Sequence, residues 1–453
     1  MNDSTFTIQY DWQNYPDCIP ELGCTSARVK LSIGNWNATD NINRDSRTIS
    51  ESVYFSLYPY ALWVARSWWR LLHETARPAS PSAQEPLWRL AHDLTSAGEG
   101  FVWPDLEYIS DGVSMQITSY STAYSKAAID YLNTFSTCIP LAVFEQAHRQ
   151  LIENVCERLN EYALTDTDLH QSWAAITSEY KDNQLKRRRV LEAGLGFDPD
   201  EAEPETLEML LDKERIIGAG SLAELASNCR RGAISSLWED CLAFERRLDN
   251  GMEGKFFLPR MSESLSRRQE LPPWEIGYSL AKTVRDAANL SPSIVQDEQL
   301  GDLLGLRAIV FSENSDERGV ALARRDENGN ARFSFPRGPK VGRRFNAARI
   351  IADALLADRD SWLTATSAAT HRQKIQRAFA GELLCPIDAL RSFIGGQEPD
   401  ADIIEEAAEY FRVSPFVPAL QLHNKGLLPH TLREAFGWEE QNVVRRRVRN
   451  AAK

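Results

Sequence analysis

The spacing of apolar residues changes twice along this chain of 453 residues, and these changes constrain its fold more than any single motif. Val29, Leu31 and Ile33 alternate with polar neighbours, which is typical of a half-buried strand. Further along, Asp111-Gly112 separates two strand-like runs and predicts a hairpin turn. We therefore expect a β-rich N-terminal domain over residues 1–125.

From residue 126 to residue 255, helical spacing replaces this alternation. The segment AVFEQAHRQLIENVCERLNEY places apolar residues three and four apart, as one buried helix face requires. The acidic link GFDPDEAEPET holds two prolines and so separates two helices. A basic run, residues 186–189, falls inside a predicted helix, and a solvated face explains it better than an anion site. This stretch is expected to be a helical middle region.

Pro272-Pro273 opens a third region with a mixed order of elements. Helical patterns flank the strand-like run RAIVFS and two further runs that meet at Asn328-Gly329, another hairpin signal. This order predicts a small antiparallel sheet flanked by helices over residues 270–430, followed by a basic tail over 431–453. The expected fold class of the whole chain is α+β.

Charge and cysteine content narrow the classes of function. The net charge of -13 argues against a protein that coats nucleic acid over its whole surface. The chain has no apolar run long enough to span a membrane, and its first residues lack a secretory signal. The seven cysteines form no CxxC pair, which favours reduced, mostly buried thiols. We therefore expect a cytoplasmic protein without membrane contacts.

Three segments in the third region carry a family resemblance. They are RRFNAARIIAD, QRAFAGELLCP and VSPFVPALQLHNKGLL, and they follow the helix LAKTVRDAANL. In this order and spacing the region resembles the ImmA/IrrE metallo-endopeptidases, over about residues 274–428. Residues 1–255 are similar to the N-terminal extension of longer bacterial members. The resemblance implies a zincin-like fold and a bacterial origin.

The zinc site implied by this resemblance is degenerate here. Family members hold zinc with two histidines of a helical H-E-x-x-H motif and a glutamate from the next helix, and the motif's own glutamate acts as general base. At these four positions the chain has Arg349, Ile350, Asp353 and Ile375. Arginine has no lone pair for a metal, and isoleucine can neither bind zinc nor accept a proton. The sequence therefore predicts no catalytic residue, no metal ligand and no cofactor.

The four replaced positions suggest a different role for this place in the fold. Arg349 and Asp353 are four apart on one helix, so we expect them to form an ion pair while Ile350 and Ile375 fill the remaining space. The alternative is that Arg349 simply faces solvent. Nearby, His371 is a candidate for a displaced ligand but is more simply a surface or capping residue.

Two further groups of polar residues are candidates for a structural or a binding role. Glu382, in GELLCP, is expected to cap or brace the fold rather than to catalyse. A basic strip at the entrance of the 343–356 helix is a candidate anion-binding or nucleic-acid-binding surface, although a solvated hairpin with its phenylalanines facing the core explains it more simply. Its residues are Arg332, Arg337, Lys340, Arg343 and Arg344.

These observations favour a catalytically inactive ImmA/IrrE-like protein that binds a protein partner, a regulator, in a bacterial stress, mobile-element or phage-defence system. Two alternatives stay open. One is an active zinc metallo-endopeptidase with non-standard ligands that cleaves a regulator, in which case zinc is its cofactor. The other is a nucleic-acid-responsive regulator that uses the basic strip. The sequence does not identify the partner, the inducing signal or the oligomeric state.

Overall fold

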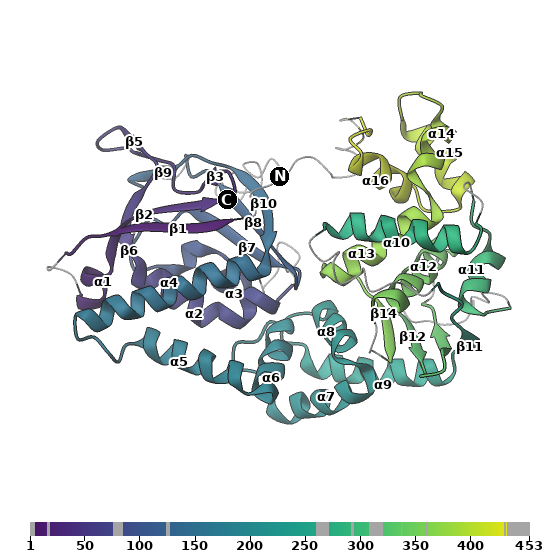
Figure 1. Cartoon of the computed structure of the whole chain (residues 1–453), viewed down its shortest axis with the longest axis horizontal. Helices are drawn as coiled ribbons and strands as arrows, with labels where there is room; N and C mark the ends of the chain where they lie inside the picture. The colour runs from purple at the N-terminus through teal and green to yellow at the C-terminus, as the bar shows by residue number, and fades with distance from the viewer. Residues whose placement is uncertain are drawn as a thin grey trace. The chain divides into compact units, whose positions relative to one another are not determined.

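The computed structural model divides the chain into two compact units (Figure 1). The described residues of the N-terminal unit lie within 5–207 and 230–234, and those of the C-terminal unit lie within 208–229 and 235–432. The fold class is α+β, as predicted. The residues that the structure describes are 5–15, 19–75, 85–123, 127–259, 271–290, 294–307, 320–336, 338–357, 361–429 and 432.

The N-terminal unit contains three small antiparallel sheets, two of which contact the helix α2 (Leu57–His73). Strand β2 of the first sheet has the predicted alternation, with Val29, Leu31 and Ile33 fully buried. The first sheet contains β1 (Phe6–Trp12), β2 (Ser26–Ile33), β3 (Trp36–Asn37) and β6 (Val53–Ser56). The second contains β7 (Asp105–Ser110), β8 (Ser114–Tyr120) and β10 (Phe135–Pro140), and the third contains β4 (Asn41–Asn43), β5 (Thr48–Ser50) and β9 (Ile129–Tyr131).

The hairpin predicted at Asp111-Gly112 is confirmed, since it joins β7 to β8. Gly112 has a φ of 92°, a conformation that glycine adopts without steric cost. The Asp111 carboxylate accepts hydrogen bonds from the amides of Val113 and Ser114, which fixes the turn. Three short helical segments complete this part of the chain: α1 (Pro20–Cys24), α3 (Glu85–His92) and the 3-10 turn η1 (Leu94–Ala97).

Helices dominate residues 141–249, but the expected helical stretch was too broad. Strands β9 and β10 lie after residue 125, and β11 (Met252–Lys255) ends at residue 255, so all three fall within the expected helical stretch. These strands are only three to six residues long, too short to outweigh the helical spacing around them. The helices are α4 (Leu141–Glu161), α5 (Asp168–Lys181), α6 (Asn183–Gly194), α7 (Pro204–Ile217), α8 (Ala219–Asn228) and α9 (Ile234–Asp249).

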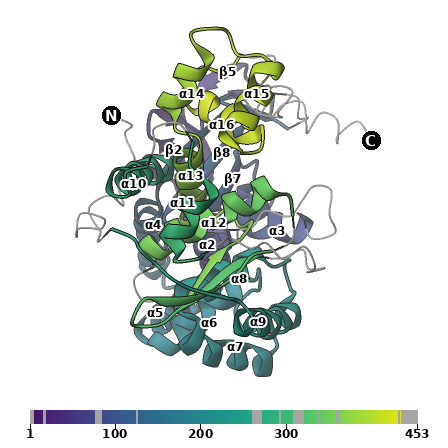
Figure 2. The same cartoon turned by 90° about the vertical axis from the view of Figure 1, so that its right-hand side faces the viewer.

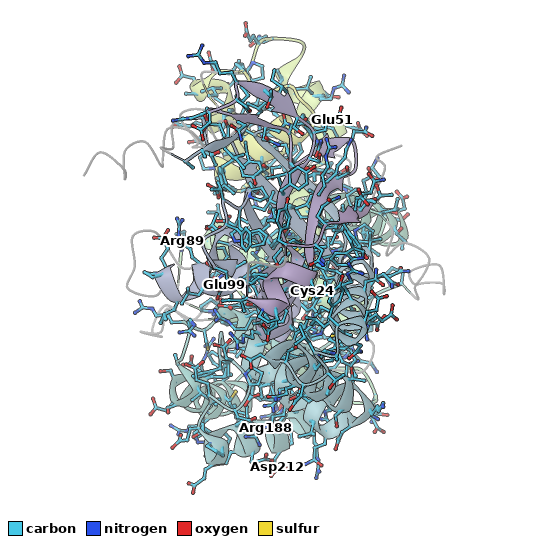
Figure 3. All side chains as sticks on the ribbon, turned by 90° about the vertical axis from the view of Figure 1, so that its left-hand side faces the viewer. Cys24, Glu51, Arg89, Glu99, Arg188 and Asp212 are labelled. Carbon is cyan, nitrogen blue, oxygen red and sulfur yellow. The ribbon has the colours of Figure 1, made fainter. Side chains whose placement is uncertain are left out.

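The basic run on α6 is only partly a solvated face. Lys186 and Arg187 are exposed, whereas Arg188, which is labelled in Figure 3, is half-buried. Arg189 is buried and forms ion pairs of 2.6 to 2.8 Å with three carboxylates. These belong to Glu179, Glu192 and Asp200. Arg189 therefore stabilises the helical region internally and offers no charge to an external anion.

The C-terminal unit is built on one antiparallel sheet with the strand order β11-β13-β12-β14. The hairpin predicted at Asn328-Gly329 is confirmed between β12 (Ala321–Arg325) and β13 (Asn330–Ser334). Strand β14 (Trp362–Ala365) pairs with β12 alone and forms one edge of this sheet. Most of the predicted strand RAIVFS lies outside the described residues.

Seven helices are described beside this sheet, and α10, α12 and α13 gather together in the C-terminal unit (Figure 2). At the crossing of α10 and α13, Gly277 lies so close that an added Cβ would be 2.7 Å from the carbonyl oxygen of Ile375. The bounds are α10 (Pro273–Ala287), α11 (Asp297–Leu304), α12 (Lys340–Leu356), α13 (His371–Leu384), α14 (Ile387–Ile394), α15 (Ala401–Phe411) and α16 (Phe416–Asn424).

The described residues also bear on the predictions about membrane spans and cysteines. Within them, the helices are too short or too polar to cross a membrane. Of the six described cysteines, Cys24, Cys156, Cys241 and Cys385 are buried, while Cys138 is exposed. Most of the described cysteines are therefore buried, as expected.

Candidate functional site

The four positions that the resemblance aligns with a zinc site lie on α12 and α13, which pack against each other. Ile350 and Ile375 belong to the apolar core of the C-terminal unit and fill it as expected. Arg349 is 7% exposed and Asp353 is fully buried, so the alternative that Arg349 faces solvent is wrong. Two charged side chains are thus held inside the fold, where each needs partners.

The predicted ion pair between Arg349 and Asp353 is also wrong. Asp353 pairs with Arg372 of α13 through two hydrogen bonds, of 2.6 Å from Nε and 2.9 Å from Nη2. Gln376 Nε2 donates to the same carboxylate over 2.6 Å. A bidentate arginine from the neighbouring helix is a stronger partner than an arginine one turn away, because two parallel bonds match the carboxylate geometry.

Asp353 also bonds the backbone of β14. Its Oδ2 accepts a hydrogen bond of 2.7 Å from the amide of Thr364. The carboxylate therefore accepts four hydrogen bonds, two on each oxygen. A carboxylate whose oxygens are committed in this way is a poor metal ligand, because a metal ion would have to displace these donors.

Arg349 bonds the backbone just beyond the end of the same strand. Its Nη2 donates to the carbonyl oxygen of Thr366 and to Oε1 of Gln373. Gln373 in turn accepts from the amide of Thr366 over 3.0 Å and donates to the carbonyl oxygen of Thr364 over 3.0 Å. Gln376 donates to that Thr364 oxygen as well, over 3.0 Å.

These contacts follow the free edge of β14. The amide of Arg325 on β12 donates to the carbonyl oxygen of Ser361, so odd-numbered residues of β14 face β12. Alternation then turns the polar backbone groups of residues 362, 364 and 366 away from the sheet. These outward groups would otherwise be an unpaired row that attracts another strand. Side chains of α12 and α13 instead form hydrogen bonds with the backbone groups of Thr364 and Thr366.

Helix α8 completes this cover within the same unit. Ser221 Oγ donates to the carbonyl oxygen of Trp362 over 2.6 Å, and the Asn228 side chain accepts from the amide of Ser367 over 3.0 Å. Arg372 also donates to Ser221 Oγ, which links the cover to Asp353. We call this set the β14 edge cluster; its members are Ser221, Asn228, Arg349, Asp353, Arg372, Gln373 and Gln376.

Glu224 of α8 lies beside the cluster. Its carboxylate accepts a hydrogen bond of 2.6 Å from Thr370 Oγ1. Burial raises the pKa of Glu224, against the lowering effects of Thr370 and Arg372. Burial also lowers the pKa of Arg349 to about 9, with a further lowering by the charge of Arg377. Because a guanidinium stays protonated at neutral pH, this lowered pKa reflects the cost of burying its charge rather than a proton that is exchanged.

The cluster does not fit the zinc that the family resemblance implies. Arg349 has no lone pair, Ile350 and Ile375 have no polar atom, and the oxygens of Asp353 are already bonded. His371 is buried at the first position of α13. Within the described ranges, His371 does not join a group of three or more metal-ligating side chains.

Glu382 lies in a separate place in the core. It is 1% exposed, and its Oε2 accepts hydrogen bonds from the amide of Ile387, at 3.2 Å, and from Gln421 Nε2, at 3.0 Å. Since Ile387 is the first residue of α14, this carboxylate caps that helix and ties it to α16. Burial raises the pKa of Glu382.

The basic strip does not form one free cationic face. Arg344 is fully buried and pairs with Asp297, which also pairs with Lys340 over 2.7 Å. Arg332 pairs with Glu253 over 2.6 Å. Arg343 is half-buried, and Arg337 lies outside the described residues. The strip's charges are thus largely compensated within the C-terminal unit.

Sequence reasoning missed most members of the edge cluster. One signal was available: Gln373 and Gln376 are three apart and continue the buried stripe of Ala380 and Leu383 on α13. Polar residues on a buried stripe indicate a hydrogen-bonding task inside the fold. Ser221 and Asn228 carried no such signal, because their target lies more than 130 residues away.

Comparison of the chain with protein-family models, with curated proteins and with solved structures gave no match. The assignment of the C-terminal unit therefore depends on its own residues and their geometry.

Proposed function

We propose that the C-terminal unit is an ImmA/IrrE-like domain that has lost hydrolysis and acts by binding a protein partner, a regulator in a bacterial stress, mobile-element or phage-defence system. The observation that carries this proposal is the commitment of Asp353 and Arg349 to the backbone of β14. In this proposal, residues at the family's zinc-ligand positions serve instead as hydrogen-bond donors and acceptors within the fold.

The β14 edge cluster also opposes the binding of an extended substrate. A peptide that adds to a sheet edge is held by main-chain hydrogen bonds to outward-facing amides and carbonyls. At β14 these groups already bond to Ser221, Asp353 and Gln373. A peptide strand would have to break these bonds before it could form its own, so a binding surface elsewhere on the protein is the better expectation.

A partner assay can separate binding from cleavage. The full chain would be incubated with a candidate regulator, with added zinc, and both complex formation and the regulator's intact mass would be followed. We expect a complex whose regulator keeps its full mass. Purified protein without a metal-affinity tag should also contain far less than one zinc per chain by mass spectrometry.

The matched variants are Asp353→Asn, inside the edge cluster, and Asp302→Asn, on the exposed side of α11. Stoichiometric zinc that is lost only in Asp353→Asn, together with a shortened regulator, would contradict the proposal. That result would establish the alternative of an active peptidase with non-standard ligands.

A further inference from the structure

A pocket of about 450 Å³ opens in the C-terminal unit between the start of α12 and the end of α15. Its lining includes Lys340 and Arg344 from α12, Glu405 and Glu409 from α15, and Arg412 just after α15. Lys340 and Asp353 are 13 residues apart on α12, roughly 20 Å along the helix axis. The pocket is thus separate from the β14 edge cluster. Its volume is in the range of small-molecule sites.

On the positively charged side of the pocket, some donor groups lack a partner among the described residues. Arg344 is fully buried and bonds Asp297 and the carbonyl oxygen of Val295, yet within the described residues its Nε lacks a hydrogen-bond partner. Arg412 is exposed and has no ion pair in the described part of the chain. The first turn of α12 adds backbone amides, since its N-cap residue, Pro339, provides no side-chain cap.

The acidic side faces the same pocket without neutralising it. Glu405 and Glu409 are exposed, one turn apart on α15, and the described residues provide neither of them with an ion-pair partner. Arg412 follows Glu409 by three residues, but its backbone is in the left-handed conformation, with a φ of 54°. Unpaired charges of both signs therefore line one cavity. The lining also includes the apolar residues Val341, Ala408 and Val413.

We propose that this pocket binds a small zwitterion with an aliphatic body, either a free amino acid or a dipeptide. Arg412 and the first turn of α12 hold its carboxylate next to Arg344, and Glu405 and Glu409 hold its ammonium group. The aliphatic part contacts Val341, Ala408 and Val413. An inorganic phosphate fits poorly, because two carboxylates at the same cavity repel a dianion. This inference is independent of the proposed function.

The test is a binding titration of the full chain with defined probes, by calorimetry. The probes are L-leucine, dileucine, leucinamide, 4-methylpentanoate and inorganic phosphate. We expect leucine or dileucine to bind with a Kd below about 1 mM. Leucinamide, which lacks the carboxylate, and 4-methylpentanoate, which lacks the ammonium group, should bind at least about tenfold more weakly, because each loses a charge-assisted contact. A preference for leucine or for dileucine distinguishes the two ligand types.

Two variants test which side of the pocket binds the carboxylate and which side binds the ammonium group. Arg412→Gln should weaken leucine or dileucine by at least about tenfold, and Glu409→Gln should do the same. Glu409→Gln should not weaken 4-methylpentanoate, since that probe has no ammonium group. Arg391→Gln is the matched control, because Arg391 is an exposed arginine of α14 outside the pocket lining.

Three outcomes would overturn the inference. The first is the absence of leucine and dileucine binding up to about 10 mM in protein that circular dichroism shows to be folded. The second is binding of phosphate that is tighter than that of either zwitterion. The third is an Arg412→Gln variant that binds like the Arg391→Gln control.

Discussion

Asp353 of α12 accepts a hydrogen bond of 2.7 Å from the amide of Thr364, so a side-chain carboxylate takes the place that a neighbouring strand would occupy beside β14. The same carboxylate holds Arg372 in a bidentate pair. One residue thereby joins α12, α13 and the sheet edge. This relationship explains why a charged side chain is fully buried at a position where the resemblance predicts a metal ligand.

Replacing Asp353 by alanine should strongly destabilise the C-terminal unit. The change leaves the Arg372 charge without its partner and the Thr364 amide without its acceptor, and breaking a buried pair costs about 3–5 kcal/mol. The free energy of unfolding of this unit can be measured by urea titration, with hydrogen exchange of α12 and α13 peptides as the readout. The exposed Asp302→Ala change on α11 serves as control and should cost less than about 0.5 kcal/mol. A loss below about 1 kcal/mol for Asp353→Ala would show that the pair contributes little.

The buried carboxyl of Glu224 predicts a pH dependence. Because burial raises its pKa in the folded state, the folded protein binds this proton more tightly than the unfolded chain does. Stability from this group is therefore greatest below the unfolded value of about 4.3 and falls as the pH rises through the raised pKa. Glu224→Gln keeps an oxygen for Thr370 but removes the charge, so its unfolding free energy should fall less than that of the wild type between pH 4.5 and 7.5.

A control variant separates the pH dependence caused by Glu224 from that caused by the other acidic residues of the chain. Glu398 is exposed, and Glu398→Gln should leave the same pH profile unchanged. An identical profile in wild type and Glu224→Gln would mean that the arginines around Glu224 compensate its burial in full.

The close crossing of α10 and α13 predicts that one methyl group added at Gly277 destabilises the C-terminal unit strongly. In Gly277→Ala the new Cβ would meet the Ile375 carbonyl oxygen and the Ala378 Cβ at 2.7 Å, so the two helices must separate. We expect a loss of about 1–3 kcal/mol in the unfolding free energy. Gly342→Ala on α12 is the matched control, since its Cβ would meet nothing within 4 Å. This second change should be neutral or stabilising by up to about 1 kcal/mol, and equal effects of the two changes would argue against the close crossing.

Local signals in the sequence were sufficient to predict much of the fold. The turns at Asp111-Gly112 and Asn328-Gly329 depend on the conformational freedom of glycine, and both hairpins form as predicted. Helix α13 ends at Leu384, two residues before Pro386, because proline cannot continue a helix. Strands β9 and β10 were missed because short strands provide few residues on which to detect alternation.

The candidate site depended on long-range geometry and was predicted only in part. The sequence identified Arg349, Ile350, Asp353 and Ile375 as positions that no longer suit zinc. It could not show that Arg372, from another helix, would replace Arg349 as the partner of Asp353. That choice depends on how α12 and α13 pack, and on the outward direction of the Thr364 and Thr366 backbone.

The most direct measurement of the central claim is amide hydrogen exchange along β14. If side chains saturate this edge, the amides of Thr364 and Thr366 should exchange as slowly as those of Leu363 and Ala365, which lie between β14 and β12. Asp353→Asn should accelerate Thr364 more than Thr366, whose amide is held by Gln373. Fast exchange at Thr364 and Thr366 in the wild type, with Leu363 and Ala365 slow, would mean that the edge of β14 is open, and it would contradict the claim that side chains seal this edge.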